Sequence, residues 1–355
     1  MKKFYNNKKV LVTGHTGFKG AWLTQILVNW GAHVVGVSLP PSTVPNLFSI
    51  LDIEKKVSNY FLDIRDLEEL KKVFEKEKPE IVFHLAAQPI VRISYEDPVG
   101  TISTNVLGTA HVLEAIKCTP SVQSAVIITT DKVYENKEWH HAYRENDPLG
   151  GYDPYSSSKA AADIITSSYM QSFFNPKDFE KTHNTLIAIA RAGNVIGGGD
   201  WAEYRLIPDV IKAVYHDNTH VEIRNPDAVR PWQHVLEPLS GYMMLGKELY
   251  EKKTMFSGVW NFGPNNESFV SVRDLAEGAK KILGKGEYVI SPDTKKHEAA
   301  LLKLDVNKAI ALLDWKPVLN FEETLDFTFS WYKNYYEKNE NVVEFTNKQI
   351  NTFFK

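Results

Sequence analysis

Short apolar runs rich in β-branched residues alternate with longer amphipathic stretches through the first half of the chain. Strands that alternate with helical segments are typical of a parallel sheet. The connecting helices then cover both faces of the sheet. Ile81-Val82-Phe83 and Val126-Ile127-Ile128 are apolar without alternation, as expected of central strands. The pattern predicts an α/β fold with a doubly wound parallel sheet. Its expected strands are Lys9–Thr13, His33–Val37, Val57–Phe61, Ile81–His84, Ala125–Thr130 and Thr185–Ala190.

Beyond Gly193 the sequence changes to glycines, tryptophans, prolines and shorter elements. We therefore expect residues 1–192 to form the sheet domain and residues 193–355 to form mainly a smaller C-terminal lobe that holds the substrate. A helix is expected near Pro238–Tyr250, entered through Arg230-Pro231-Trp232-Gln233-His234. Gly258–Phe262 is expected to return to the sheet.

The charge and the cysteine content narrow the function classes. A net charge of -3 over 355 residues gives no general attraction to polyanions, so nucleic acid is not an expected partner. Cys118 is the only cysteine, which excludes an intrachain disulfide and favours a reducing compartment. We expect its side chain to be buried as a small apolar group. No apolar stretch approaches the roughly 18 residues of a membrane span, so a cytoplasmic protein without membrane association is predicted.

A glycine-rich segment, Gly14-His15-Thr16-Gly17-Phe18-Lys19-Gly20, follows the first strand and opens a helix. Glycines there allow a tight turn, and the helix N-terminus offers unpaired N–H groups to a pyrophosphate. The segment predicts a Rossmann-type dinucleotide site, and its G-x-x-G-x-x-G spacing resembles that of extended short-chain dehydrogenases. The expected contacts are Gly14, Thr16, Gly17, Phe18 and Gly20.

The second strand gives information about the cofactor. It ends in Val37-Ser38-Leu39-Pro40, without the acidic residue that commonly binds the ribose hydroxyls. No Lys or Arg between His33 and Ile53 could pair with a 2′-phosphate, which favours NAD over NADP. Lys19 could still serve a phosphate from the glycine loop, so this preference stays open.

Three downstream segments resemble the remaining cofactor contacts of that family: Asp63-Ile64, Leu85-Ala86-Ala87-Gln88 and Asn105. Asp63 can accept a hydrogen bond from the adenine amine, and the small Ala86 and Ala87 let the chain pass close to the cofactor. Each segment alone is more simply interpreted as a turn or a helix-packing site. Their order and spacing favour the cofactor interpretation.

Tyr155-Ser156-Ser157-Ser158-Lys159 places a phenol and an ammonium on one helix face, four residues apart. A tyrosine acts as a base at neutral pH only if its pKa falls from about 10 toward 7, roughly 4 kcal/mol of preference for the phenolate. Lys159 and a positive nicotinamide can supply that preference. Such a spacing often marks an ordinary solvated helix face, but together with the glycine loop it predicts a catalytic pair.

Thr129-Thr130-Asp131-Lys132 lies at the end of the fifth predicted strand, where α/β sheets bind their ligands. A carboxylic acid at this position can protonate a departing hydroxyl, which elimination of water requires. The alternative is that Asp131 merely caps a turn. We include Thr129 among the expected cofactor contacts, and Thr130, Asp131 and Lys132 among the expected catalytic residues.

The segment resembles that of nucleotide-sugar 4,6-dehydratases, and Lys132 after the acid is similar to the branch acting on CDP-glucose. Residues 8–335 carry the resemblance, which includes Arg191–Trp201, Arg230–Leu239 and the pair His297-Glu298. One departure is His140-His141, where relatives have bulky apolar residues. The resemblance implies a hydro-lyase of deoxysugar biosynthesis, as for the lipopolysaccharide O-antigen, that works as a homodimer or a higher oligomer.

The resemblance also implies the mechanism. Tyr155 removes the proton of the sugar 4-hydroxyl while hydride passes from C4 to NAD, and Thr130 steadies the alcohol oxygen. Asp131 protonates the departing 6-hydroxyl, and hydride returns to C6. Lys132 either takes the C5 proton or stabilises the enolate as a fixed positive charge.

The diphosphate of the substrate needs placed cations, for which Arg205 and Arg230 are the candidates. Asn194 and Gln88 are the other expected substrate contacts. A 4-epimerase or a dehydratase for another nucleotide-sugar is the enzymatic alternative. A binding protein that senses NAD without turnover is the alternative from another class. No metal site is expected.

Overall fold

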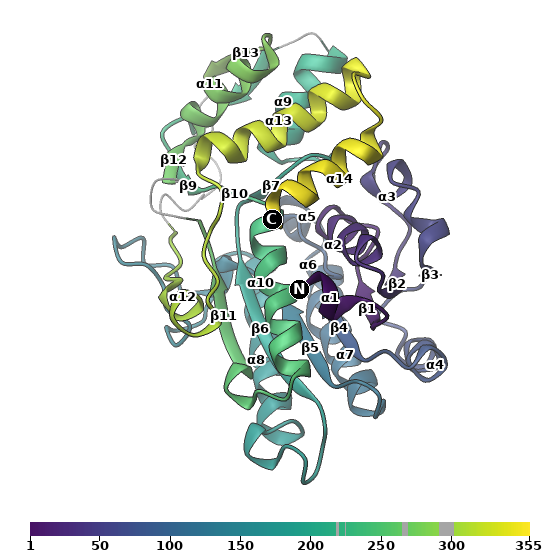
Figure 1. Cartoon of the computed structure of the whole chain (residues 1–355). Coiled ribbons are helices and arrows are strands. Elements are labelled where there is room, and N and C mark those ends of the chain that lie inside the picture. The colour runs from purple at the N-terminus through teal and green to yellow at the C-terminus, as the bar shows by residue number, and fades with distance from the viewer. Residues whose placement is uncertain (218–219, 224, 265–268, 291–301) are drawn as a thin grey trace.

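The computed structural model describes residues 1–355 except 218–219, 224, 265–268 and 291–301, so His297-Glu298 lies outside the described residues. A parallel seven-stranded sheet in the order β11-β6-β5-β4-β1-β2-β3 forms its centre (Figure 1). The predicted doubly wound α/β fold is confirmed. The strands are β1 (Lys9–Thr13), β2 (His33–Ser38), β3 (Ser58–Phe61), β4 (Ile81–His84), β5 (Ser124–Ile128), β6 (Leu186–Ala192) and β11 (Gly258–Phe262).

Helices cover both faces of this sheet. Val10 and Val12 of β1 belong to one core cluster with Leu23 of α2 (Phe18–Asn29) and Leu239 of α10 (Leu236–Tyr250). Leu11 of β1 belongs to a second cluster on the opposite face. The helices of that face are α4 (Leu67–Glu77), α7 (Gly108–Lys117) and α8 (Pro154–Ser172). The unbroken apolar runs of the sequence therefore reflect burial on both sides of the sheet.

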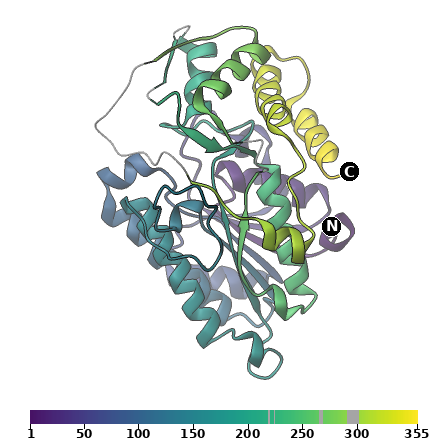
Figure 2. The same ribbon diagram turned by 90° about the vertical axis from the view of Figure 1, so that its left-hand side faces the viewer.

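A smaller set of elements lies at one end of the sheet (Figures 1 and 2). Its helices are α9 (Leu206–Lys212), α11 (Val272–Leu283), α13 (Phe321–Glu337) and α14 (Val342–Phe353). Its strand pairs are β7 (Val195–Ile196) with β10 (Gln233–His234), β8 (His220–Ile223) with β13 (Glu287–Ile290), and β9 (Val229–Pro231) with β12 (Phe269–Ser271). From this half of the chain, β11 pairs with β6 at the edge of the central sheet, as the sequence predicts.

The remaining helices are short. They are α1 (Lys2–Tyr5), α3 (Leu47–Ile50), α5 (Val91–Glu96), α6 (Pro98–Ile102), α12 (Asn307–Leu313), the π-helical turns η2 (Ser103–Leu107) and η5 (Ala213–Asp217), and the 3₁₀ turns η1 (Ile53–Lys56), η3 (Asp131–Val133), η4 (Pro176–Asp178) and η6 (Thr254–Phe256). Within the described part of the chain, no helix combines the length and apolar character needed to cross a membrane.

Two expectations need correction. The fifth strand ends at Ile128, two residues earlier than predicted, so Thr129 and Thr130 lie beyond it and Asp131 opens the turn η3. Cys118 is exposed, and the prediction that it is buried is wrong. It lies at the C-terminal cap of α7, past the last residue that faces the core.

Candidate active site

The turn between β1 and α2 fits closely against the end of β4. Gly14 has a φ of +76°, and a Cβ atom there would lie 2.7 Å from the Ala86 nitrogen. A Cβ at Gly20 would lie 2.0 Å from the Gly14 carbonyl oxygen. Only glycine can satisfy both requirements, because other residues disfavour that φ and would clash with backbone atoms.

The start of α2 has the properties of an anion site. Gly17 is the N-cap residue, is exposed and forms no side-chain cap, so the first N–H groups of the helix remain available. The hydroxyl of Thr16 lies 2.8 Å from that of Ser38 and donates to the Leu39 carbonyl at 2.9 Å. Two hydroxyls therefore lie where the second strand lacks an acidic residue. These features fit a dinucleotide whose pyrophosphate lies on the helix N-terminus.

The downstream candidates for cofactor and substrate contacts are engaged with protein groups. Asp63 forms an ion pair with Arg65 at 2.6 Å, and this hydrogen bond holds the pKa of the carboxyl below its usual value. Asn105 is buried; its side chain accepts from the Gln88 backbone N–H and donates to the Ser158 hydroxyl. The Gln88 amide donates to Thr101 and accepts from Ile90 N–H. Leu85, Ala86, Ala87 and Ile64 border the same region, with the first three half-buried and Ile64 buried.

Tyr155 and Lys159 lie in the first turns of α8, which begins at Pro154 after the N-cap Asp153. The Lys159 ammonium donates to the Ile128 carbonyl at the end of β5, 2.8 Å away, and thereby ties the helix to the strand. Burial lowers the pKa of Lys159 to about 8. Burial raises the pKa of Tyr155 to about 12, while a hydrogen bond with Thr130 opposes that rise.

The acid of the site is Asp131, which is 2% exposed. The Thr130 hydroxyl donates to its Oδ1 atom at 2.9 Å. Its Oδ2 atom is buried and has no hydrogen-bond partner among the described residues. One carboxyl oxygen therefore has a hydrogen-bond donor in the protein, while the other is buried without a partner among the described residues. Lys132, the next residue, is exposed.

Two further side chains, Lys19 and Tyr242, interact electrostatically with this acid. Lys19 of the glycine loop interacts electrostatically with Asp131 and with Arg205, and burial followed by repulsion from Arg205 lowers its pKa to about 8. The Lys19 ammonium lies 6.0 Å from the ring centre of Tyr242 on α10. The Tyr242 hydroxyl is buried, has no hydrogen-bond partner within the described residues and interacts electrostatically with Asp131. The sequence indicates Lys19 only as a candidate phosphate ligand, and no motif in it points to Tyr242.

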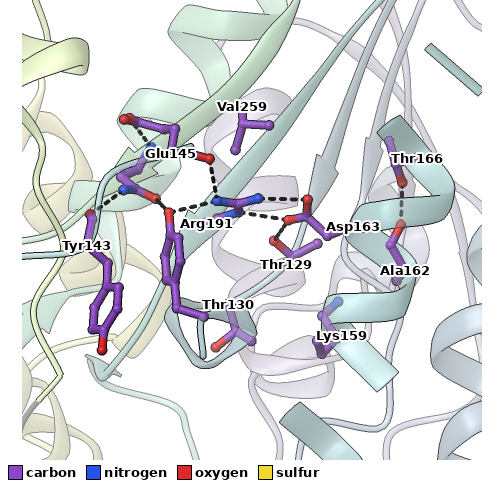
Figure 3. A network of polar contacts seen from close by, with 12 residues as sticks. Thr129, Thr130, Tyr143, Glu145, Lys159, Ala162, Asp163, Thr166, Arg191 and Val259 are labelled. Carbon is purple, nitrogen blue, oxygen red and sulfur yellow. Dashed lines mark hydrogen bonds and ion pairs between the residues drawn. The ribbon is translucent and has the colours of Figure 1, made fainter. Parts of the chain in front are cut away.

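A buried polar network connects α8, the helix that carries Tyr155 and Lys159, with β6 and β11 (Figure 3). The Arg191 guanidinium binds both carboxyl oxygens of Asp163, each at 2.8 Å, and both side chains are at most 2% exposed. Thr129 donates to the same carboxyl at 3.2 Å. Arg191 also donates to the Tyr134 hydroxyl, which donates to Asn261 of β11. Sequence reasoning missed this network because its members lie far apart in the chain.

The candidate substrate residues separate into two groups. Arg205, the N-cap of α9, donates to Asp200 at 2.9 Å and interacts electrostatically with Tyr155, which places it beside the catalytic pair. Asn194 lies two residues after the end of β6, with a φ of 49°. Arg230 lies in β9, a strand of a separate small sheet, and donates to the Val229 carbonyl. The structure thus brings Arg205 close to the catalytic pair, while Arg230 belongs to the C-terminal elements.

The comparison with known proteins defines the class. Residues 11–328 match the family described as GDP-mannose 4,6 dehydratase, so the chain belongs to that family. An epimerase of Methanothermobacter thermautotrophicus shares the fold, with a TM-score of 0.80, 24% identity and coverage of 95% of both chains. A Bacillus cereus UDP-glucuronic acid 4-epimerase in complex with UDP-glucuronic acid and NAD gives a TM-score of 0.77 at 24% identity over 92% of this chain and 100% of that one.

Within the family, a closer likeness exists. The chain is 48% identical over 333 residues to the CDP-glucose 4,6-dehydratase of Salmonella typhimurium, which covers 94% of this chain and 92% of the relative. The predicted family resemblance to nucleotide-sugar 4,6-dehydratases is confirmed.

Proposed function

We propose that the chain catalyses the NAD-dependent dehydration of CDP-glucose to CDP-4-keto-6-deoxyglucose. One arrangement carries the proposal: a buried carboxylic acid, a phenol and the hydroxyl that links them lie beside a dinucleotide cradle. The 48% identity to a CDP-glucose 4,6-dehydratase supports cytidine as the base. The NAD complex of the Bacillus cereus structure, together with the open helix N-terminus at Gly17, supports NAD as the cofactor.

The glycine turn and the N-terminus of α2 would hold NAD, which would supply the transfer of hydride from C4 to C6 of the hexose with no net consumption of the cofactor. Tyr155 takes the proton of the 4-hydroxyl, with the Lys159 ammonium favouring the phenolate. The resulting ketone acidifies the C5 proton, and Asp131, whose Oδ2 has no hydrogen-bond partner in the described protein, protonates the departing 6-hydroxyl. Lys132 is the adjacent cation for the developing enolate, because its exposed side chain can turn toward a bound sugar.

The positively charged side chains at the site are the candidates for binding the diphosphate of the substrate. Arg205, which interacts electrostatically with Tyr155, is our first candidate for the diphosphate, and Lys19, which interacts with Arg205, adds a second cation. We retain Arg230, Asn194 and Gln88 as further candidates. We infer that residues 1–192 hold mainly the cofactor and that residues 193–355 hold mainly the nucleotide-sugar.

We further infer a homodimer, formed through the helices that flank the catalytic pair. Large apolar side chains are exposed on these helices, which a partner subunit could cover. They are Val99, Ile102, Leu107 and Ile164, each at least 48% exposed. We also infer a cytoplasmic reaction that supplies deoxysugars, as for the lipopolysaccharide O-antigen.

One experiment tests the reaction and the base together. The protein is incubated with CDP-, dTDP- and UDP-glucose, and the 4-keto product is followed by its absorbance in alkali. We expect the chromophore from CDP-glucose alone. A chromophore from another nucleotide would contradict the base preference, and formation of a galactose epimer without chromophore would indicate a 4-epimerase.

A further inference from the structure

Each turnover leaves Tyr155 and Asp131 in protonation states that cannot begin the next turnover. Each turnover delivers the proton of the 4-hydroxyl to Tyr155, while Asp131 loses a proton to the departing 6-hydroxyl, which leaves as water. The proton taken from C5 returns to C5, and the hydride taken from C4 ends on C6. Product release therefore leaves a neutral phenol and a carboxylate, whereas the next turnover needs a phenolate and a carboxylic acid. In every cycle, Tyr155 must therefore lose one proton and Asp131 must gain one.

A single hydroxyl joins the two groups. Thr130 Oγ1 donates to Asp131 Oδ1 at 2.9 Å, and a side-chain hydrogen bond connects Thr130 with Tyr155. A threonine hydroxyl has one proton and two acceptor sites. Because its proton is directed at Asp131, the proton in the contact with Tyr155 is the phenol's own. The backbone N–H of Lys132, 3.4 Å away, uses the other acceptor site.

We propose that Thr130 relays this proton and so resets the enzyme between turnovers, an inference that rests on the proposed dehydration. The Tyr155 O–H bond breaks as a proton moves to Thr130 Oγ1, and the Thr130 O–H bond breaks as its proton moves to Asp131 Oδ1. Thr130 ends neutral, Tyr155 ends as phenolate and Asp131 ends as the acid. No oxidant, reductant or other reactant is consumed.

Two features favour this route over exchange with solvent. Thr130 is 6% exposed and Asp131 is 2% exposed, so bulk water has little access to either group. The proton arrives on Oδ1, while the buried Oδ2 has no hydrogen-bond partner among the described residues. The carboxyl therefore receives its proton on one side and presents its other oxygen to the substrate.

The test compares the first turnover with later ones. Thr130→Val keeps the size and shape of the side chain but removes the relay, and Thr130→Ser keeps the hydroxyl. Thr166→Val is the matched control, because the buried Thr166 hydroxyl on α8 donates only to the Ala162 carbonyl. For Thr130→Val we expect a burst near one product per active site, followed by a steady state at least about tenfold slower than the burst. Thr130→Ser and Thr166→Val should lack this separation.

Infrared difference spectra of the protein give a second readout. After a single turnover, the band of the protonated Asp131 carboxyl should recover in the wild type and in Thr130→Ser but remain lost in Thr130→Val. Slowing of the first and later turnovers of Thr130→Val by one common factor, with normal recovery of the band, would overturn the relay alone. A wild-type protein that forms no 4-keto sugar would overturn the proposed function together with the relay.

Discussion

The carboxyl group of Asp131 lies directly against the Cα atom of Gly193, so that a Cβ at residue 193 would be 2.0 Å from the Asp131 Cγ. Gly193 follows β6, and Asp131 follows the neighbouring strand β5. The parallel pairing of the two strands therefore brings the acid and the glycine to the same edge of the sheet. No larger residue at position 193 is compatible with the observed position of the acid.

We expect Gly193→Ala to displace the Asp131 carboxyl and to lower kcat by about 100-fold, because a shift of about 1 Å in a reacting group has that effect. Overpacking should also cost about 1–3 kcal/mol of the free energy of unfolding. Gly263→Ala is the control, since a Cβ there would lie 3.5 Å from Leu304, an ordinary contact. Kinetics and urea denaturation of both variants provide the measurement. Full activity of Gly193→Ala would show that the acid can act from another position.

Asp131→Asn should leave NAD bound and lower dehydration by about 10²–10⁴-fold, the range associated with loss of a general acid. The amide keeps the shape of the side chain but cannot protonate the 6-hydroxyl. In a single turnover, the absorbance of the reduced nicotinamide should accumulate in Asp131→Asn but not appear in Tyr155→Phe, which lacks the base. Unchanged turnover of Asp131→Asn would remove this residue from the mechanism.

The buried ion pair between Arg191 and Asp163 predicts a large loss of stability on breaking it. Arg191→Met leaves the Asp163 carboxylate buried with only Thr129 as a donor, which should cost about 3–5 kcal/mol in urea denaturation. Activity should fall as well, because Asp163 lies one turn after Lys159 on α8. A double variant, Arg191→Met with Asp163→Leu, should recover part of the lost stability. A single variant as stable as the wild type would contradict a role for the pair in holding α8.

The sequence predicts much of this architecture because local patterns determine it. The apolar run Ile81–His84 marks its strand with the observed bounds, and the four-residue spacing of Tyr155 and Lys159 predicts their common helix. Contacts made only by tertiary packing could not be predicted in this way. Gln88 and Asn105, which were expected to face ligands, bond to each other and to neighbouring groups.

The pairing of Arg191 with Asp163 is another contact of the site that the sequence could not predict. The pair connects β6 with α8, and a sequence pattern gives no indication of which buried carboxylate an arginine meets. Lys19 and Tyr242 approach Asp131 only because the strand order places the ends of β1 and β5 on either side of β4. Parallel pairing predicts that such ends share an edge, but the side chains that meet there depend on the packing of α2 and α10.

The lowered pKa of Lys159, about 8 through burial, predicts the alkaline limb of the pH profile. The protonated amine is the form that supports the phenolate, so kcat should fall as the pH rises through about 8. Lys159→Arg keeps its charge at higher pH and should retain a reduced activity with the limb moved upward. The measurement is kcat at saturating substrate between pH 6 and about 10. A limb at the same pH in Lys159→Arg would assign the titration to another group.

Lys19 should reduce stability while it supports activity. Its pKa of about 8, lowered by burial and then by Arg205, lies below the value of about 10.5 expected for the unfolded chain. Between these values the unfolded chain binds more protons, so the free energy of unfolding rises with pH across the window, and the charged amine is disfavoured at neutral pH. Lys19→Met should therefore stabilise the protein at pH 7 by about 1 kcal/mol, allowing for solvent screening of a half-buried group.

The same substitution should lower kcat by at least about tenfold, because it removes a cation that interacts with Asp131 and Arg205. Lys308→Met is the matched control. Lys308 is also half-buried with a lowered pKa, but it donates to the Val259 carbonyl at 2.7 Å and lies over the Trp260 ring, away from the acid. We expect this control to keep its kcat. Full activity of Lys19→Met would show that the Lys19 charge has no role in the reaction. A loss of stability in Lys19→Met would show that burying this charge does not destabilise the folded protein, contrary to its lowered pKa.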